Sequence, residues 1–403
     1  MMKINKGFNH PLMSNNITSD DNNQVINFLK DDPKLTNGKK VKEFEKKWSR
    51  WLGVKHSVFV NSGSSANILS LSYLRTIYPA GGEVIVPSLN WVSNINAILY
   101  AGFKPVLIDV NLNNLGASEK QIKKAINKRT VAIFITHILG FSAFSSQTLK
   151  ILNQRKRKLF IIEDVCESHG AKFKNRKLGT FGNISNFSFY YAHHMTTIEG
   201  GMICTNNRNI YESLRIMRSH GMLRESTSEL LKKKIYKKYE NLNKDFIFLY
   251  PGYNFRSTEI NAVYGINQLK KLDLNNKKRI FNFNFFLKNL NSKKYFTDFV
   301  LDGSCNYAFV VLFKENLRNF KFRKKFEFTL KKHNIEFRRG TSGGGNQAMQ
   351  PYLNFFKSKI IRKFNLKNIN IIHKYGYYLG NFPDLEKKKI LKICQILNSI
   401  NHD

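Results

Sequence analysis

Cysteine is scarce in this sequence, and no long apolar run is present. The four cysteines, Cys166, Cys204, Cys305 and Cys394, are separated by long, irregular intervals and form no CxxC pair. This spacing argues against a zinc or iron–sulfur site built from neighbouring thiolates and against a disulfide framework. No run reaches the roughly 18 apolar residues that span a membrane, and the start, MMKINKGFNHPLMSNN, lacks a secretory signal. We therefore expect a cytoplasmic protein with no metal and no membrane partner.

Acidic residues are also few, at 28 against 66 lysines and arginines, which gives a formal net charge of +38. Such a charge fits nucleic-acid binding. The basic residues are, however, scattered along all 403 residues, and no single arm or helix holds them. We therefore expect solvated basic faces and no nucleic-acid partner. The positive field can still speed the capture of an anionic substrate.

Hydrophobic residues make up 42% of the chain, enough for a sizeable core. From about residue 54, short apolar runs alternate with helical stretches. The expected strands are 54–61, 83–88, 104–110, 131–139, 158–165, 184–191 and 200–206, and the helices between the early ones are 64–78, 91–102, 118–127 and 146–156. Near-continuous apolar runs are typical of strands covered on both faces. The pattern predicts an α/β fold with a mostly parallel, seven-stranded sheet.

The flanking segments complete the expected organisation. An amphipathic helix over 36–53 precedes the sheet, residues 207–250 are charged and helical, and residues 252–273 form a turn that leads into a helix. From about residue 275 a second unit begins, with a strand at 306–313, a glycine-rich loop at 340–347 and a closing helix at 384–400. We predict a large domain of residues 1–274, including an N-terminal arm, and a smaller α+β domain of residues 275–403.

Polar motifs follow several of the predicted strands, at the edge of such sheets where ligands bind. In VNSGSSAN (60–67), Gly63 permits a tight turn, and Ser64 and Ser65 open a helix whose N–H groups suit a phosphate. The alternative is that these serines only cap the helix. Trp91, in PSLNWVS, either stacks on a flat ring or packs as a half-buried aromatic. Asp164, in IIEDVCESHG, either caps the strand or pairs with a ring nitrogen.

Two histidines, His193 and His194, follow the next strand in NFSFYYAHHMTTIEGGM, five residues after Ser188. Adjacent side chains diverge on a strand or a helix, so the pair is poorly suited to chelating one metal ion. A structural histidine remains an alternative. Together, a phosphate cradle, a stacking aromatic, a carboxylate for a ring nitrogen and a base describe a site for pyridoxal phosphate.

The motifs GKKVKEFEKKW, NSGSSAN, PSLNWVS, IEDVCESHG, FSFYYAHHMTTIEGG and GYNFRSTEINAVYGINQL resemble the DegT/DnrJ/EryC1/StrS family of sugar aminotransferases. The likeness runs in order across residues 10–275 and continues more loosely to the C-terminus. It implies an aspartate-aminotransferase-like fold, pyridoxal or pyridoxamine phosphate as cofactor, and a homodimer with shared active sites.

The resemblance also implies roles for single residues. Ser64, Ser65 and Ser188 would hold the cofactor phosphate, Trp91 would stack on its ring, and Asp164 would pair with the ring nitrogen. Asn254 would reach the phosphate in the partner subunit. Arg256 would meet the substrate, and Arg224 would bind the carboxylate of the amino-acid co-substrate. We expect His194 either to support the site residues from behind or to be a turn residue, and Arg338 or Arg339 to lie near the sugar with the glycine-rich loop.

One departure from the family pattern sets the expected reaction. Typical members carry a lysine six residues before the glutamate of EGG, where this chain has His193, and no lysine occurs between Lys177 and Lys232. Histidine cannot tether the cofactor, but it can accept and return protons near neutral pH. The substitution resembles the 3-dehydratase branch of the family, and the missing cysteine cluster favours the kind without an iron–sulfur cluster.

The implied activity is dehydration at C3 of a nucleotide-linked 4-keto-6-deoxyhexose, with L-glutamate as amino donor and His193 as the base. The product, a 4-keto-3,6-dideoxy sugar, would serve surface polysaccharide (O-antigen) synthesis. Two alternatives stay open at this point: an ordinary nucleotide-sugar aminotransferase and a non-catalytic nucleotide-sugar-binding homologue. The sequence does not identify the nucleotide or the configuration of the hexose.

Overall fold

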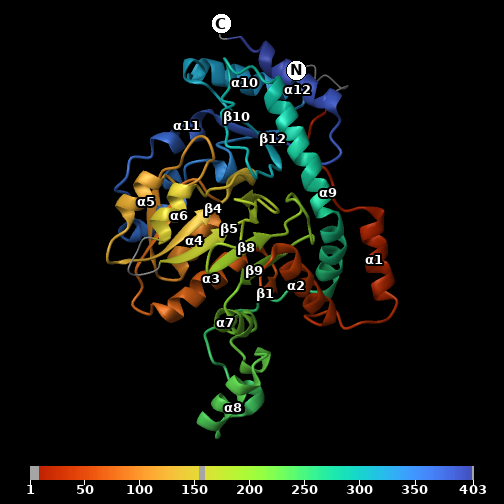
Figure 1. Cartoon of the computed structure of the whole chain (residues 1–403), viewed down its shortest axis with the longest axis vertical. Helices are drawn as coiled ribbons and strands as arrows, with labels where there is room; N and C mark the ends of the chain where they lie inside the picture. Colours follow the sequence, from red (N-terminus) through yellow and green to blue (C-terminus); the bar gives the residue numbers. More distant parts are fainter. Residues whose placement is uncertain (1–8, 154–158, 402–403) are drawn as a thin grey trace.

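The computed structural model describes residues 9–153 and 159–401 (Figure 1). Its centre is a seven-stranded sheet with the order β1-β9-β8-β5-β4-β2-β3. β9 is antiparallel to both of its neighbours, and every other pair in the sheet is parallel. The strands are β1 (His56–Val60), β2 (Glu83–Pro87), β3 (Lys104–Ile108), β4 (Thr130–Thr136), β5 (Phe160–Asp164), β8 (Ile184–Ser188) and β9 (Gly201–Thr205). The prediction of a mostly parallel seven-stranded sheet is confirmed.

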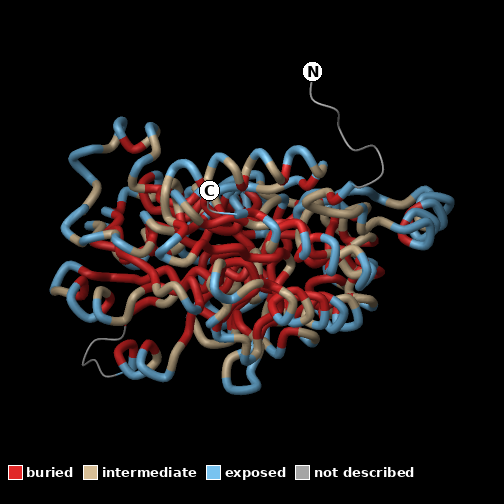
Figure 2. The backbone as a smooth tube through the Cα atoms, turned by 90° about the horizontal axis from the view of Figure 1, so that it is seen from above, coloured by how far each residue is buried: buried red, intermediate tan, exposed pale blue. Residues whose placement is uncertain are grey.

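Both faces of this sheet are buried, which explains the continuous apolar runs in the sequence. Alternate residues of β2 enter different clusters: Ile85 belongs to the cluster that contains Phe44 and Trp48, whereas Val84 and Val86 belong to the cluster that contains Leu69. The buried interior is continuous through the middle of the molecule (Figure 2). The helices of this part are α1 (Ser19–Leu29), α2 (Lys39–Leu52), α3 (Gly63–Ile77), α4 (Val92–Tyr100), α5 (Glu119–Ala125), α6 (Ser146–Asn153) and α7 (Arg208–Arg218).

Most of the predicted helices are present, but some details differ. Residues 154–156 of the predicted helix 146–156 lie outside the described residues. Helix α1 and the short hairpin of β6 (Lys172–Phe173) and β7 (Arg176–Lys177) were not predicted. The predicted helical stretch 207–250 is interrupted, because His220 and Gly221 adopt positive φ angles of 62° and 81° and turn the chain after α7.

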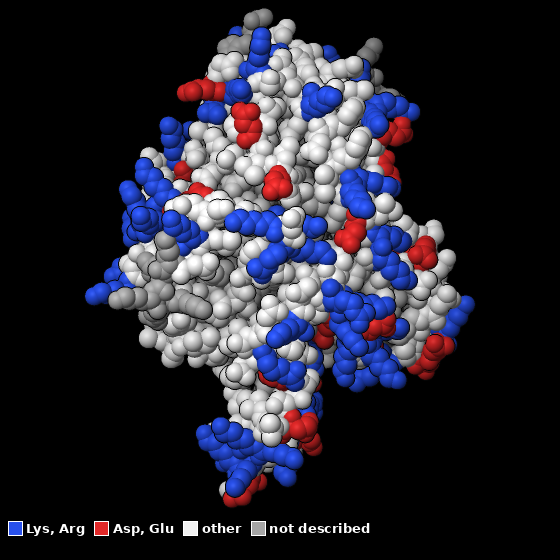
Figure 3. All heavy atoms as spheres, viewed as in Figure 1, with Lys and Arg blue, Asp and Glu red and all other residues white. Residues whose placement is uncertain are grey.

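Beyond that turn, the chain forms η2 (Leu223–Glu225), α8 (Glu229–Lys238) and η3 (Lys244–Phe246). α8 projects from the sheet at the end opposite the small unit, which is the C-terminal part of the chain with its own three-stranded sheet (Figure 1). Groups of lysines and arginines are scattered over the face shown in Figure 3 from one end to the other, with acidic residues among them. No helix within the described ranges has both the length and the apolar character needed to cross a membrane.

Helix α9 (Glu259–Asn289) is 31 residues long and joins the two parts of the chain. At its start, the Glu259 carboxylate accepts hydrogen bonds of 2.8 Å from the backbone N–H groups of Gly38, Lys40 and Val41. These N–H groups lie at the start of α2, where the helix itself offers them no acceptor. The N-cap residue of α2, Gly38, has no side chain that could accept from them. The predicted domain division after residue 274 falls inside α9, so both predicted units share this helix.

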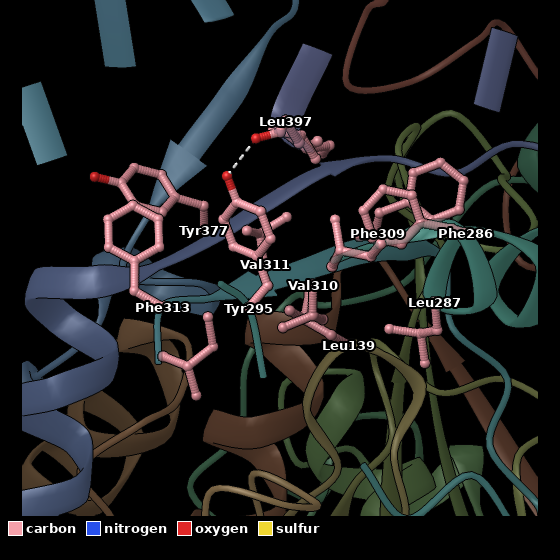
Figure 4. Close-up of a cluster of buried hydrophobic side chains, with 14 of the residues drawn as sticks. Leu139, Phe286, Leu287, Tyr295, Phe309, Val310, Val311, Phe313, Tyr377 and Leu397 are labelled. Atoms are coloured by element: carbon pink, nitrogen blue, oxygen red, sulfur yellow. Dashed lines mark hydrogen bonds between the residues drawn. The ribbon is translucent and has the colours of Figure 1, made fainter. Parts of the chain in front are cut away.

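The C-terminal part contains a three-stranded antiparallel sheet with the order β10-β12-β11. In chain order, the elements of this part are β10 (Ala308–Leu312), η4 (Glu315–Leu317), α10 (Phe320–Lys332), β11 (Phe337–Arg339), η5 (Ser342–Gly344), η6 (Gln347–Met349), η7 (Pro351–Lys359), α11 (Lys367–Tyr375), β12 (Gly376–Gly380) and α12 (Lys387–Ser399). Phe286 of α9 stacks on Phe309 of β10 with ring centroids 4.4 Å apart, and the Tyr295 hydroxyl donates to the Leu397 carbonyl at 2.7 Å (Figure 4). α9 therefore contributes directly to the core of the small unit.

The N-terminal segment is fastened to this small unit by a buried histidine. His10 has no exposed surface, its Nε2 bonds the Gly380 carbonyl at 2.9 Å, and its ring stacks on Phe382. Burial lowers the pKa of His10 to about 4. The imidazole is therefore neutral in the folded protein at pH 5, whereas in the unfolded chain it is mostly protonated.

We predict that His10→Gln makes folding less sensitive to acid. The unfolded wild-type chain binds more protons at His10 than the folded chain between pH 6.5 and 4, so stability falls as the pH drops through this range. Between pH 7 and pH 5, the wild type should lose about 2 kcal/mol more of its unfolding free energy than the variant does. Urea unfolding at the two pH values measures this difference. Equal losses in the two proteins would contradict the assignment.

Candidate active site

Two strand ends and one helix start meet at the carboxyl edge of the sheet. β5 ends at Asp164, its parallel neighbour β8 ends at Ser188, and α3 begins at Gly63 directly after β1. A Cβ atom on Gly63 would lie 2.6 Å from the Cβ of Ser188, so only glycine allows this close approach. Ser188 therefore lies against the first turn of α3, where Ser64 and Ser65 are located.

The start of α3 is capped by Ser62, whose hydroxyl accepts a hydrogen bond from the Ser65 N–H at 3.0 Å. Ser64 is exposed, and the Ser65 hydroxyl lies 2.9 Å from that of Ser62. Neither Ser64 nor Ser65 is needed as the N-cap. The first turn of this 15-residue helix thus combines serine hydroxyls with the positive end of the helix dipole, an arrangement that suits a phosphate.

Asp164 is buried at the end of β5, with 5% of its surface exposed. One carboxylate oxygen accepts from the Cys166 N–H at 3.0 Å, and the other accepts from the Asn67 side-chain amide at 3.2 Å. Asn67 is itself fixed, because its Oδ1 accepts from the Asn186 amide at 2.8 Å. Each carboxylate oxygen has a further lone pair, so Asp164 can accept an additional N–H group from a ligand.

Trp91 lies just past the end of β2 and is 56% exposed, which is high for so large an aromatic residue. The glycine-rich loop of the small unit packs beside it. The Gln347 N–H donates to the Ser88 carbonyl at 3.0 Å, and Gly343 lies so close to the Asn90 carbonyl that a Cβ would collide with it. This loop therefore borders the same edge of the sheet, while Arg338 and Arg339 are exposed on β11.

His193 lies in the loop between β8 and β9. Its N–H donates to the Tyr190 carbonyl at 3.0 Å, and its carbonyl accepts from the Asn16 amide at 3.1 Å. The imidazole has neighbouring rings at 5.9 Å (Tyr307), 6.0 Å (Tyr190) and 6.1 Å (His169). Its Nδ1 is buried and has no hydrogen-bond partner among residues 9–153 and 159–401. The loop thus fixes the backbone of His193 and leaves one ring nitrogen unbonded.

The surroundings of His193 disfavour a positive charge. Burial is the main reason that its pKa is lowered to about 4, and the nearby guanidinium of Arg279 adds to the effect. Burial also lowers the pKa of His169 and of His194 well below the usual value. His194 is buried, and its Nε2 bonds the Cys305 carbonyl at 2.8 Å. At pH 7 His193 is therefore a neutral imidazole that can accept a proton.

Of the remaining predicted residues, one lies beside a strand end of its own chain and two lie away from the strand ends. Arg256 is beside Val60 at the end of β1, and Asn254 is exposed and pairs through its backbone with Ser219. Arg224 is exposed, with its guanidinium 5.9 Å from the centre of the Phe246 ring, on the segment that carries α8. The structure thus groups Ser64, Ser65, Ser188 and Asp164 at one edge. The roles of all these residues stay predictions.

Sequence reasoning missed two side chains that support this edge. Asn67 ends the motif NSGSSAN, and its position one turn into the predicted helix was a usable signal. Glu167, three residues after Asp164, accepts hydrogen bonds from the Leu139 N–H at 2.9 Å and the Ser342 hydroxyl at 2.6 Å. Burial raises the pKa of Glu167 to about 7. Nothing in its local sequence indicates these distant partners.

The described part of the chain contains no group of three or more His, Cys, Asp or Glu side chains positioned to hold a metal ion. The four cysteines are all free; Cys166 is half-buried and the other three are buried.

The sheet order, the helix start facing the strand ends and the smaller C-terminal sheet with its helices define an aspartate-aminotransferase-like fold, as predicted. The chain belongs to the DegT/DnrJ/EryC1/StrS aminotransferase family, whose sequence model matches residues 15–398.

Three comparisons describe its position in the family. GDP-4-keto-6-deoxy-D-mannose 3-dehydratase of Escherichia coli O55:H7 is 31% identical over 93% of this chain and 95% of that protein. A crystal structure of GDP-4-keto-6-deoxymannose-3-dehydratase with a trapped PLP-glutamate geminal diamine has a TM-score of 0.87 and 27% identity, covering 96% of this chain and 100% of that one. UDP-4-amino-4,6-dideoxy-N-acetyl-beta-L-altrosamine transaminase of Campylobacter jejuni subsp. jejuni serotype O:23/36 is 32% identical over 70% of each chain. Dehydratases and transaminases are thus related to this chain at similar identity.

We predict that Asn67→Leu destabilises the protein by about 2–4 kcal/mol, because the buried Asp164 and Asn186 side chains each lose a hydrogen-bond partner. Urea unfolding at pH 7 measures the change. Asn209→Leu, at an exposed position of α7, is the matched control and should change stability by less than about 0.5 kcal/mol. Equal effects at the two positions would show that the Asn67 contacts are not important for stability.

Proposed function

We propose that this chain is a pyridoxal phosphate-dependent 3-dehydratase that acts on a nucleotide-linked 4-keto-6-deoxyhexose. The observation that carries the proposal is a neutral histidine, His193, at the position where typical members of the family have a lysine. Residues 178–231 contain no lysine, and the two lysines on either side of this segment have other partners. Lys177 donates to the Trp51 carbonyl, and Lys232 pairs with Glu229 on α8 at 3.0 Å. Neither of them supplies an amine beside Asp164.

The residues at the carboxyl edge of the sheet fit the cofactor. The first turn of α3 and Ser188 provide hydroxyls and N–H groups for a phosphate, and the contact at Gly63 leaves no room for a Cβ between them. Asp164 has free lone pairs for a protonated ring nitrogen, and Trp91 offers an exposed aromatic face. When bound there, the cofactor would carry the amino group and act as an electron sink.

In this proposal the residues of the chain bind, orient and move protons. Asp164, held by Asn67, keeps the ring nitrogen protonated. His193 would accept, on a ring nitrogen, a proton from the C4′ carbon of the bound cofactor and would deliver it to the C3 hydroxyl of the sugar, which leaves as water. The neutral imidazole suits both steps, since it is unprotonated at pH 7 and its conjugate acid is strong.

Further parts of the proposal come from the family resemblance and from the named relatives. We infer that L-glutamate donates the amino group, with Arg224 on its carboxylate and Arg256 on the substrate. We also infer that two copies share their active sites through Asn254 and that residues 275–403 form a smaller second domain, joined to the first through α9. The enzyme would work in the cytoplasm and supply surface polysaccharide synthesis. The names of the dehydratase relatives make GDP-4-keto-6-deoxymannose the first substrate to test.

A product assay tests the proposed reaction. The protein is incubated with L-glutamate, pyridoxal phosphate and a panel of 4-keto-6-deoxy nucleotide sugars. A dehydratase should give a sugar lighter by one oxygen atom, with one 2-oxoglutarate and one ammonia for each sugar. A transaminase, the alternative favoured by the Campylobacter relative, would instead give an amino sugar without ammonia. Formation of the amino sugar, or of no product with any member of the panel, would contradict the proposal.

We predict that His193→Lys lowers dehydration at least about 100-fold, because the general acid and base is lost. The new amine should also bond covalently to the cofactor. Borohydride reduction followed by peptide mass analysis should then find the cofactor on residue 193 of the variant and not on the wild type. His333→Asn, a change at the end of α10, serves as a control with unchanged turnover. Retained dehydration in His193→Lys would contradict the role of His193.

A further inference from the structure

Tyr307 lies where the small unit meets the histidine loop, which is the segment 189–200 between β8 and β9. It directly precedes β10, in a segment held by two backbone contacts to the large unit. The Cys305 carbonyl accepts from His194 Nε2 at 2.8 Å, and the Cys305 N–H donates to the Gly140 carbonyl at 2.8 Å. Gly140 has a φ of 93° and lies so close to Cys305 that any Cβ would collide with it. The position of Tyr307 relative to the histidine loop is therefore tightly fixed.

The ring of Tyr307 contacts both histidines of the loop. Its centroid is 5.9 Å from that of His193, with the two planes at 72°, and 5.5 Å from that of His194. An edge-to-face contact of this kind has a preferred geometry. It restricts rotation of the His193 imidazole, whose backbone is already fixed on both sides by Tyr190 and Asn16.

The hydroxyl of Tyr307 interacts with the Glu167 side chain. Glu167 in turn bonds the Leu139 N–H and the hydroxyl of Ser342 in the glycine-rich loop. Burial and the neighbouring carboxylate raise the pKa of Tyr307 well above its usual value, so the hydroxyl remains a donor. A continuous chain of contacts thus runs from the glycine-rich loop through Glu167 and Tyr307 to His193.

We propose that Tyr307, anchored by Glu167, is a positioning residue that orients the His193 imidazole and keeps water away from it. This inference rests on the proposed function for its catalytic consequence, but not for its structural content. The other titratable groups facing His193 are Arg279 of α9, His169 of the β5–β6 loop, and His194 and Tyr190 of its own loop. None of these is altered in the test.

The test compares Tyr307→Phe, which keeps the ring and removes the hydroxyl, with Tyr307→Leu, which removes the ring. The first measurement needs no activity: the titration of His193 in the full-length chain labelled with ¹⁵N-histidine, with the signal assigned through His193→Asn. In Tyr307→Leu, water reaches the imidazole, so its pKa should rise from about 4 towards 6.5, by about one pH unit or more. In Tyr307→Phe, the pKa should stay close to that of the wild type.

The second measurement is turnover. We expect kcat to fall about 3- to 10-fold in Tyr307→Phe and further, by about 100-fold, in Tyr307→Leu, with KM for the sugar within about 2-fold, because the lost property is orientation of the base. Tyr377→Phe is the matched control. It removes a hydroxyl that bonds Glu327 at 2.9 Å in the same unit, and it should leave both measurements unchanged.

The outcomes separate the two proposals. An unshifted His193 titration in a folded Tyr307→Leu protein overturns the positioning role of the ring, whatever the enzyme does. If Tyr307→Leu does not fold, wild-type kcat in Tyr307→Phe overturns the role of the anchored hydroxyl. A shifted titration together with no dehydration by the wild type would sustain the environment assigned to His193 and refute the proposed reaction.

Discussion

A carboxylate buried at the end of a central strand is the constraint on which the proposed site depends. Asp164 lies where β5 ends, and burial without compensating hydrogen bonds would be unfavourable for its charge. The compensation comes partly from its own turn, through the Cys166 N–H, and partly from Asn67 on α3. One amide thereby fixes the position of a helix relative to a strand. The same helix start faces Ser188, so satisfying the carboxylate also assembles the region suited to a phosphate.

In the histidine loop, the protonation state of the side chains depends more on exclusion of water than on hydrogen-bond partners. His193 and His194 are buried among aromatic rings and lie near the guanidinium of Arg279, and both the burial and this positive charge disfavour the imidazolium. A lysine at position 193 would meet the same surroundings, which would disfavour its ammonium form as well. The environment therefore favours a neutral nitrogen on either side chain. The side chain at this position then decides whether that nitrogen can bond the cofactor or only exchange protons.

The fold was largely predictable because its strands are covered on both faces and read as continuous apolar runs, as in VAIFITHIL for β4. The polar residues after these strands were identifiable for a related reason, since parallel strands place their ends at one edge. Helix α1, in contrast, has few apolar residues, and the break after α7 depends on the backbone angles of His220 and Gly221. Glu167 and Tyr307 were missed because they are 140 positions apart in the sequence and meet only through packing of the small unit. The same holds for the bond between Glu167 and Ser342.

Helix α9 begins against α2, continues past the sheet and ends in the core of the small unit. A rigid rod embedded at both ends cannot act as a hinge, so the two units are not free to swing as separate bodies about the junction near residue 274. Under the proposed function, an opening that admits a nucleotide sugar would have to come from shorter elements, such as the glycine-rich loop with its three successive positive φ angles at Gly343, Gly344 and Gly345. The 31 residues of α9 thus make one stiff frame of the two units, and the substrate of the proposed reaction would enter without a movement of one whole unit against the other.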